Sequence, residues 1–337
     1  MALRLLILVA LLLPSVSYCI PEEDIPESYD SLVWAFYEKH TEARQFSSHD
    51  GRNIYYYLVN QDDKSAEKAY VFVSPGRTES SFKYAELVYD LYQEGFSLIL
   101  IDHRGQGKSN RLSANFGVSY VDTFEDYVKD LEVLFLQELK LDDKPKFVWA
   151  HSMGAHIVSR FILKHPTYFD RLVLSSPMFD MKTAPLPELF AYWLFRVPSL
   201  LGFGENYFFG QTEYIPGEVY RGTSSTIRYE AMIKKRNQYP KEWIGGVSFH
   251  WLAESIVSCE YILERAHELT QPILMLQGGS DGVVDLEGQT YVCQKAKNCD
   301  LKVFPKAAHE ILNEVDVIRK PAYDAVLSFF NEHWQAG

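Results

Sequence analysis

Six short runs of apolar and often β-branched residues constrain the fold of this chain more than any other feature. Within each run the apolar side chains follow one another almost without interruption, so both faces of the predicted strands are expected to be buried. Strands of this kind are typical of a parallel sheet with helices on both faces. The runs cover residues 69–74, 96–102, 146–152, 171–176, 272–278 and 301–304.

Helical patterns lie between these runs. In residues 123–139 apolar side chains recur at steps of three and four, and Thr123 stands where a helix cap is needed. Strands that alternate with helices predict an α/β fold with a mostly parallel sheet and right-handed crossovers. Earlier in the chain, Asp50 and Gly51 form a turn signal within residues 44–60, which predicts an antiparallel hairpin at the sheet edge.

The alternation of strands and helices stops between residues 177 and 270, where Pro, Gly and aromatic residues are frequent. Because strands resume afterwards, we interpret 177–270 as a helical cap inserted into one α/β domain, whose core consists of residues 20–176 and 271–337. A hydrophobic fraction of 47% is sufficient for a core of this size. The formal net charge of −12 argues against a nucleic-acid partner held by broad electrostatics.

Residues 1–19 have the layout of a secretory signal peptide, because Arg4 precedes an apolar run over 5–13 and small residues follow. Cleavage after Ser17 or after Cys19 satisfies the preference for small residues at the cleavage site. The apolar run is too short to span a bilayer comfortably. We therefore predict an exported protein, either periplasmic or secreted, with an uncleaved membrane-attached N-terminus as the alternative.

Two of the four cysteines are informative in such a compartment. Cys293 and Cys299 are close enough in the sequence to close a short disulfide loop under oxidising conditions. Cys259 lies within a helical pattern and is expected to be a buried apolar residue.

The run over 146–152 ends on Ser152, with the small residues Ala150 and Gly154 two positions to either side. A strand that turns sharply into a helix can expose one nucleophile at the carboxyl edge of a sheet, and this tight turn requires small neighbours. The usual pattern has glycine where this chain has Ala150, a substitution that adds only a methyl group. We therefore predict that Ser152 is a catalytic nucleophile.

A serine hydroxyl needs a base, and the base needs an acid that orients it. Asp281 follows the run over 272–278, and His309 follows the run over 301–304. Since the carboxyl ends of parallel strands share one edge of the sheet, Ser152, Asp281 and His309 are expected to converge as a triad. Asp285 remains an alternative acid, with Asp281 then serving as a turn former.

The oxyanion of the intermediate requires two backbone donors. One is expected to be the amide of Met153, directly after the nucleophile. The other is assigned to the amide of Arg77, in the loop after the run over 69–74, where Gly76 allows a close approach of the substrate.

Two motifs that suggest other chemistry fail on closer inspection. Residues 102–109 end like a phosphate-binding loop, but Asp102 stands where that loop needs its first glycine. Residues 309–313 begin like a zinc-binding helix, but Asn313 stands at the position of the second histidine. We therefore expect neither a metal nor a cofactor.

With these residues in place, the chain resembles an α/β-hydrolase of the lysophospholipase L2 and monoacylglycerol lipase group, and the lysophospholipase branch most closely. The resemblance spans about residues 45–335 and rests on the blocks 74–111, 147–156, 175–181, 245–256 and 307–312. It implies a serine hydrolase that cleaves the remaining acyl ester of lysophospholipids through an acyl-enzyme. By position it assigns Ser152 as nucleophile, Asp281 as acid and His309 as base. The chain departs from the monoglyceride lipases at Pro75, where they commonly have histidine before the glycine.

Aromatic residues crowd 190–209, where they either pack the cap onto the core, line an acyl site or touch a bilayer surface. We expect Phe195 and Trp193 of this stretch, together with Gly76, to contact a lipid or small ester substrate. The alternatives are a monoacylglycerol lipase, a small-ester carboxylesterase, a prolyl-type aminopeptidase and an inactive binding protein. A peptidase would use acidic cap residues to hold a free amine, for which Glu188, Glu205 and Glu213 are candidates.

Overall fold

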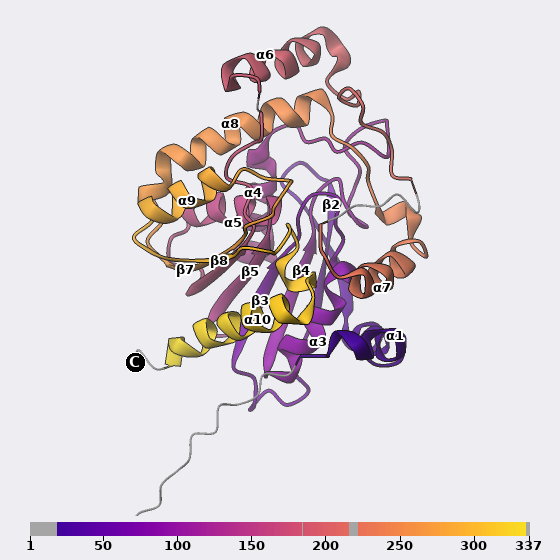
Figure 1. The fold of residues 1–337 in the computed structure, drawn as a ribbon, viewed down its shortest axis with the longest axis vertical. Helices are drawn as coiled ribbons and strands as arrows, with labels where there is room; N and C mark the ends of the chain where they lie inside the picture. The colour runs from indigo at the N-terminus through magenta and orange to yellow at the C-terminus, as the bar shows by residue number, and fades with distance from the viewer. Residues whose placement is uncertain (1–18, 184, 216–221, 335–337) are drawn as a thin grey trace, which may run out of the picture.

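The computed structural model describes residues 19–183, 185–215 and 222–334, which contain an eight-stranded sheet in the order β1-β2-β4-β3-β5-β6-β7-β8 (Figure 1). The strands are β1 (Glu42–Ser47), β2 (Asn53–Val59), β3 (Ala69–Ser74), β4 (Phe96–Asp102), β5 (Lys146–His151), β6 (Arg171–Ser175), β7 (Pro272–Gly278) and β8 (Asn298–Phe304). All six predicted runs are confirmed as strands. β5 and β6 each end one residue early because Ser152 and Ser176 adopt positive φ angles of 51° and 45°. β8 begins three residues earlier than predicted, at Asn298.

The sheet is mostly parallel, as predicted. From β4 through β3, β5, β6 and β7 to β8, each neighbouring pair runs in parallel. β1 and β2 form the predicted antiparallel hairpin at the edge, and β2 pairs antiparallel with β4. Because the six parallel strands point the same way, the loops after β3, β5, β7 and β8 all emerge at one edge of the sheet.

Helices cover both faces of the sheet, and each face has its own apolar core. One core includes residues of α4 (Phe124–Val133), α5 (Met153–Lys164), α8 (Phe249–Arg265) and α9 (Leu286–Lys295). The other includes residues of α1 (Ile25–Ser28), α2 (Ala35–His40), α3 (Ala85–Gln93) and α10 (Asp316–Asn331). The predicted helix over 123–139 is confirmed as α4 and a π-helical turn over Leu134–Glu138, and Thr123 and Asp126 form a capping box at its start.

The segment between β6 and β7 is helical, and we call residues 177–270 the cap. It contains α6 (Glu188–Pro198), α7 (Thr226–Arg236) and α8. α8 packs on α4 and α5 of the core, and α6 packs on α8, so α6 lies farthest from the sheet (Figure 1). α7 lies apart from α6, next to the start of the described chain, where it contacts α1.

Residues 1–18 of the predicted signal peptide lie outside the described residues. Of the predicted 1–19 segment the structure describes only Cys19, which is half-buried and contacts the Arg319 guanidinium. No helix in the described ranges has the length and apolar character that crossing a membrane requires.

Candidate active site

Ser152 occupies a strained turn between β5 and α5. Its backbone has φ 51° and ψ −119°, a conformation that only a tightly constrained turn imposes on a residue other than glycine. The turn is fixed by neighbouring strands and loops, because the Ser152 amide donates to the Ser175 carbonyl at 3.0 Å and the Ser152 carbonyl accepts from the Met178 amide at 3.1 Å. A Cβ at Gly154 would clash with the backbone oxygens of Ser74 and Pro75, which explains the need for glycine there.

His309 and Asp281 form a direct pair. His309 Nδ1 lies 2.6 Å from Asp281 Oδ2, and both side chains are buried. The other carboxylate oxygen of Asp281 accepts from the amides of Val283 at 2.7 Å and Val284 at 3.3 Å. Burial raises the pKa of Asp281, but the hydrogen bond and charge of His309, with these two amides, outweigh burial and hold the pKa below its usual value. Asp281 is therefore an ionised acceptor that fixes the orientation of the imidazole.

The alternative acid, Asp285, has a different role in the structure. It is the N-cap of α9, where its Oδ1 accepts from the amides of Glu287 at 2.7 Å and Gly288 at 3.4 Å. Helix capping is a common structural role of aspartate, and it accounts for Asp285 without a catalytic role.

Ser152 and His309 line the same pocket, which has a volume of about 440 Å³. Its other walls come from the loop after β3, through Arg77, and from the cap, through residues such as Trp243 and Trp251. Of the three residues predicted as a triad, the structure pairs His309 with Asp281 and places Ser152 and His309 on the wall of one pocket.

The two expected oxyanion donors are the amides of Met153, in α5, and of Arg77, in the loop after β3. Met153 is the first residue of α5, so its amide has no carbonyl acceptor earlier in that helix. Arg77 lines the pocket, and the amides on either side of it are engaged: Gly76 donates to Glu79 Oε2 at 2.5 Å and Thr78 donates to Gln106 Oε1 at 2.8 Å. Gly76 is needed because a Cβ there would press on the Glu79 carboxylate.

Sequence reasoning missed a buried ion network beside the site. Lys83 Nζ lies 2.5 Å from Glu79 Oε1 and 2.7 Å from Glu310 Oε1, and all three side chains are nearly inaccessible. Burial lowers the pKa of Lys83, but Glu310 and Glu79 outweigh it and raise the value above the usual one. The network joins the loop after β3 to the loop that carries His309. The four-residue spacing of Glu79 and Lys83 was the one signal available in the sequence.

His151, the residue before the predicted nucleophile, stays neutral. Burial and the positive charges of His309 and Lys83 hold the pKa of His151 well below its usual value. Its ring centroid lies 4.6 Å from that of His309. Because His151 carries no charge, it adds no repulsion to a positive charge on His309.

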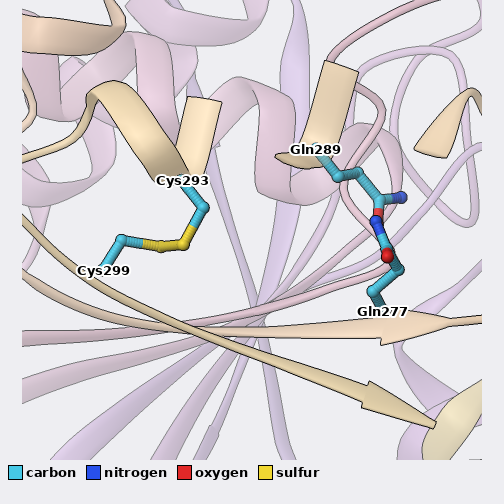
Figure 2. The surroundings of a disulfide bond; sticks show 4 residues. All are labelled: Gln277, Gln289, Cys293 and Cys299. Carbon is cyan, nitrogen blue, oxygen red and sulfur yellow. A yellow bond between two sulfur atoms is a disulfide. The ribbon is translucent and has the colours of Figure 1, made fainter. Parts of the chain in front are cut away.

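The loop that carries Asp281 is anchored at both ends. On β7, Gln277 Nε2 donates to the Gln289 Oε1 of α9 at 3.1 Å, as the two facing side chains in Figure 2 show. The predicted disulfide between Cys293 of α9 and Cys299 of β8 is present in the structure (Figure 2). These links hold α9 against the sheet and so restrict the loop between β7 and α9. Cys259 is buried, as predicted.

The loop that carries His309 is tied to the cap. The Glu310 amide donates to the Gly222 carbonyl at 2.7 Å, and Thr223 Oγ1 donates to the Asn313 carbonyl at 2.7 Å. Buried Glu314 accepts from the amides of Ala308 at 2.8 Å and Ser224 at 3.0 Å. The position of His309 therefore depends on cap residues 222–224 as well as on the core.

The structure does not bring the two expected aromatic contacts to this pocket. Phe195 is buried against Phe208, with ring centroids 5.2 Å apart. Trp193 is 50% exposed, packs edge-on against Tyr192, and does not line the pocket. Both residues are on α6, which rests on α8, so the aromatic content of this stretch did not indicate which side chains face the substrate.

Two guanidiniums that could have met a phosphate are engaged elsewhere. Arg104 is fully buried and pairs with Asp130 and Asp50, which makes it a brace for the loop after β4. Arg77 Nη1 donates to Ser119 Oγ and to the Gly245 carbonyl, both at 3.0 Å.

Comparisons with known proteins agree with this arrangement. The sequence profile of the family described as serine aminopeptidase, S33, matches residues 65–316. Lysophospholipase L2 of Escherichia coli (strain K12) is 35% identical over 277 residues, which are 78% of this chain and 80% of that protein. Monoglyceride lipase of Mus musculus is 25% identical over 267 residues, 78% of this chain and 82% of that protein.

The solved structure of a thermostable carboxyl esterase from Bacillus coagulans, in complex with glycerol, shares the fold. Its TM-score is 0.67 at 19% identity, with 86% of this chain and 98% of that chain covered. The S33 profile spans most of the chain, and lysophospholipase L2 of Escherichia coli aligns over most of its own length. This protein therefore belongs to the S33 serine aminopeptidase family of α/β-hydrolases, in the group of lysophospholipase L2 and the monoglyceride lipases.

Proposed function

We propose that this protein is an exported serine hydrolase that cleaves the acyl ester of lysophospholipids, with Ser152 as nucleophile, His309 as base and Asp281 as orienting acid. The observation that carries the proposal is the buried His309–Asp281 pair at the pocket that Ser152 also lines. The strained backbone of Ser152 supports its role, because strain of this kind is typical of a nucleophile at a strand-to-helix turn.

In the first half of the reaction, Ser152 Oγ attacks the ester carbonyl carbon and His309 Nε2 takes the hydroxyl proton. The amides of Met153 and Arg77 donate to the oxyanion of the tetrahedral intermediate. The intermediate collapses as the bond to the glycerol oxygen breaks, and that oxygen takes the proton from His309. The glycerophosphate alcohol leaves, and the acyl group stays on Ser152.

In the second half, water attacks the acyl-enzyme while His309 removes its proton. Collapse of the second intermediate breaks the bond to Ser152 Oγ, which regains its proton from His309, and the fatty acid is released. In both halves ionised Asp281 stabilises the transient positive charge on His309, as its lowered pKa supports.

A lipid substrate is supported by the relatives. This chain is 35% identical to a protein described as lysophospholipase L2 and 25% identical to a monoglyceride lipase. Both names describe hydrolases of lipid esters, which supports the same class of substrate here. Although the family profile is described as an aminopeptidase, two of the three acidic residues considered for a free amine lie outside the pocket, and only Glu213 lines it. Glu205 instead accepts from Ser113 at 2.7 Å.

Membrane contact through the cap is part of the proposal. α6 is the cap helix that lies farthest from the sheet (Figure 1). Large apolar side chains of α6 and of the turn after it are exposed. They are Leu189, Phe190, Trp193, Val197, Leu200, Leu201 and Phe203. An apolar surface of this kind suits an enzyme that takes its substrate from a lipid surface. Leu200→Ser combined with Leu201→Ser should weaken co-sedimentation with phosphatidylcholine vesicles and leave hydrolysis of a soluble ester unchanged.

Export is supported by the layout of residues 1–19 and by the Cys293–Cys299 disulfide, a bond typical of proteins in oxidising compartments. Fractionation of expressing bacteria, with mass spectrometry of the mature N-terminus, tests this point. Cleavage after Ser17 or Cys19 is expected, and an intact Met1 in the cytoplasmic fraction would contradict it.

The substrate is tested by comparing kcat/KM for two palmitoyl esters with different head groups and for one short-chain ester. We expect 1-palmitoyl-lysophosphatidylcholine to exceed both 1-monopalmitoylglycerol and p-nitrophenyl acetate, and a proline aminopeptidase substrate to be inert. Ser152→Ala serves as the control that identifies background hydrolysis. A higher kcat/KM for p-nitrophenyl acetate than for the palmitoyl esters would contradict a lipid substrate. A higher kcat/KM for 1-monopalmitoylglycerol than for the lysophospholipid would instead make the protein a monoacylglycerol lipase.

A further inference from the structure

We propose that Arg236 is the phosphate-binding residue of the pocket and selects substrates with a phosphorylated glycerol head group. This inference deepens the proposed lysophospholipase function and rests on it. Arg236 is the last residue of α7 and lines the same pocket as Ser152 and His309. The geometry therefore allows one ligand to reach the ester-cleaving residues and a guanidinium at once.

Arg236 is held between two aromatic rings. Its guanidinium carbon lies 3.7 Å from the ring centroid of Tyr214 and 4.0 Å from that of Trp243. Stacking of this kind fixes the plane of a guanidinium while leaving its N–H groups at the edge free to donate. A planar guanidinium fixed in this way can donate two parallel hydrogen bonds to two oxygens of one phosphate.

Among the described residues, no carboxylate lies within ion-pair distance of the guanidinium, although the charges of Glu310 and Glu79 act on it from farther away. None of these residues accepts a hydrogen bond from its buried Nε atom either. Its neighbours on α7 differ in this respect, because Lys234 and Lys235 both pair with Asp30. A buried donor without a partner is costly. Because no described protein group pairs with this guanidinium, its outer N–H groups are left for an acceptor on a ligand.

The other cations of the pocket are already committed to protein groups. Lys83 pairs with Glu79 and Glu310, and the Arg77 guanidinium donates to Ser119 and to the backbone. A second donor stands next to Arg236: the indole Nε1 of buried Trp243 has no hydrogen-bond partner among the described residues. Indole and guanidinium nitrogens donate and cannot accept, so this end of the pocket is complementary to oxyanions.

The chemistry of the ligand follows from the covalent layout of the substrate. In a lysophospholipid the phosphate is attached to the same glycerol that carries the acyl ester, so an anion site within the ester-binding pocket would meet it. A monoacylglycerol has a hydroxyl at that place and gains little from a guanidinium. Arg236 would therefore raise kcat/KM for the phosphorylated substrate specifically.

The test compares Arg236→Gln with Lys234→Gln, which removes a positive charge from the same helix outside the pocket. We expect Arg236→Gln to lower kcat/KM for 1-palmitoyl-lysophosphatidylcholine by about 10- to 100-fold, the range of one lost hydrogen-bonded charge. Hydrolysis of 1-monopalmitoylglycerol and p-nitrophenyl butyrate should change less than about 2-fold, as should every substrate in Lys234→Gln. Arg236→Lys should recover part of the lost kcat/KM, since lysine restores the positive charge but cannot donate two parallel hydrogen bonds to one phosphate. An equal loss on all three esters would show a structural role and overturn the proposal.

A second measurement separates this proposal from the proposed function. sn-Glycerol 3-phosphate should inhibit p-nitrophenyl butyrate hydrolysis competitively in the wild type, with a Ki at least about 10-fold higher in Arg236→Gln. Inorganic phosphate gives the contribution of the anion without glycerol, and equal inhibition by both would assign the site to free phosphate. If the wild type cleaves no lysophospholipid but glycerol 3-phosphate inhibits through Arg236, the anion site stands and the lysophospholipase assignment fails. If glycerol 3-phosphate inhibits both proteins equally, the anion site is overturned.

Discussion

Replacement of Asp281 by Asn tests the proposed division of labour between Asp281 and His309. The carboxylate accepts from His309 Nδ1 at 2.6 Å and from the amides of Val283 and Val284. An asparagine oxygen can keep the two amide bonds, but its NH₂ group then faces His309 Nδ1. The imidazole must shift its proton to Nε2, the nitrogen that has to accept from Ser152, so the base is lost without removal of the ring.

The expected loss is large for such a small change of shape. A tautomer change of this kind lowers kcat about 10⁴-fold in serine hydrolases, which corresponds to about 5 kcal/mol of transition-state stabilisation. KM should change little, because Asp281 reaches the pocket only through His309. The free energy of unfolding should fall by about 1–3 kcal/mol, the cost of one buried charged hydrogen bond.

The assay is steady-state hydrolysis of 1-palmitoyl-lysophosphatidylcholine together with thermal unfolding. Asp285→Asn is the matched control: Asn caps a helix as well as Asp, so both activity and stability should be nearly unchanged. Loss of activity in Asp285→Asn with an active Asp281→Asn would refute the reasoning and make Asp285 the acid.

Three further changes probe the surroundings of the site. Replacing Cys293 by Ser opens the loop closed by two cysteines 6 positions apart and should lower the free energy of unfolding by about 2 kcal/mol, seen as a lower Tm. Gly154→Ala should prevent folding or abolish activity because its Cβ clashes with backbone oxygens, whereas Gly282→Ala, which has open space around it, should behave as wild type in the same ester assay. Lys83→Met leaves two buried carboxylates without their cation and should cost about 3–5 kcal/mol at pH 7 in urea unfolding. Burial raises the pKa of Glu310, but the charge and hydrogen bond of Lys83 outweigh burial and hold the pKa below its ordinary value. The stability that the pair contributes is therefore present above the ordinary pKa and is lost as the pH falls through the lowered one, so mutant and wild type should converge in acid.

The sheet and the three candidate catalytic residues were within reach of the sequence because their signals are local. Each strand is a continuous apolar run, and Ser152, Asp281 and His309 each follow a different strand whose carboxyl end lies at the same sheet edge. The order along the chain then places them in one region without any contact being known. The hairpin over β1 and β2 was found in the same way, from a two-residue turn signal.

What the sequence could not provide are contacts between segments far apart in the chain. Lys83 with Glu310 and Gln277 with Gln289 are pairs whose partners no periodic pattern connects. Arg236 was missed for the same reason, since its significance lies in its stacking between two distant rings and in the lack of an ion-paired carboxylate among the described residues. Phe195 and Trp193 were expected at the substrate because of composition, but composition does not specify which face of α6 is buried.

The predicted signal peptide, its cleavage and export remain predictions, because residues 1–18 lie outside the described part of the chain. The division into core and cap follows the order of elements, in which the helical segment 177–270 separates β6 from β7.

The central claim is that Ser152 is made nucleophilic by its own turn and by His309. Labelling of the wild-type protein with a fluorophosphonate, followed by peptide mass spectrometry, measures this directly. The account predicts one covalent adduct on Ser152, loss of ester hydrolysis in proportion to labelling, and no adduct in a folded Ser152→Ala variant. An adduct on another residue, or labelling of Ser152→Ala at the wild-type rate, would contradict it.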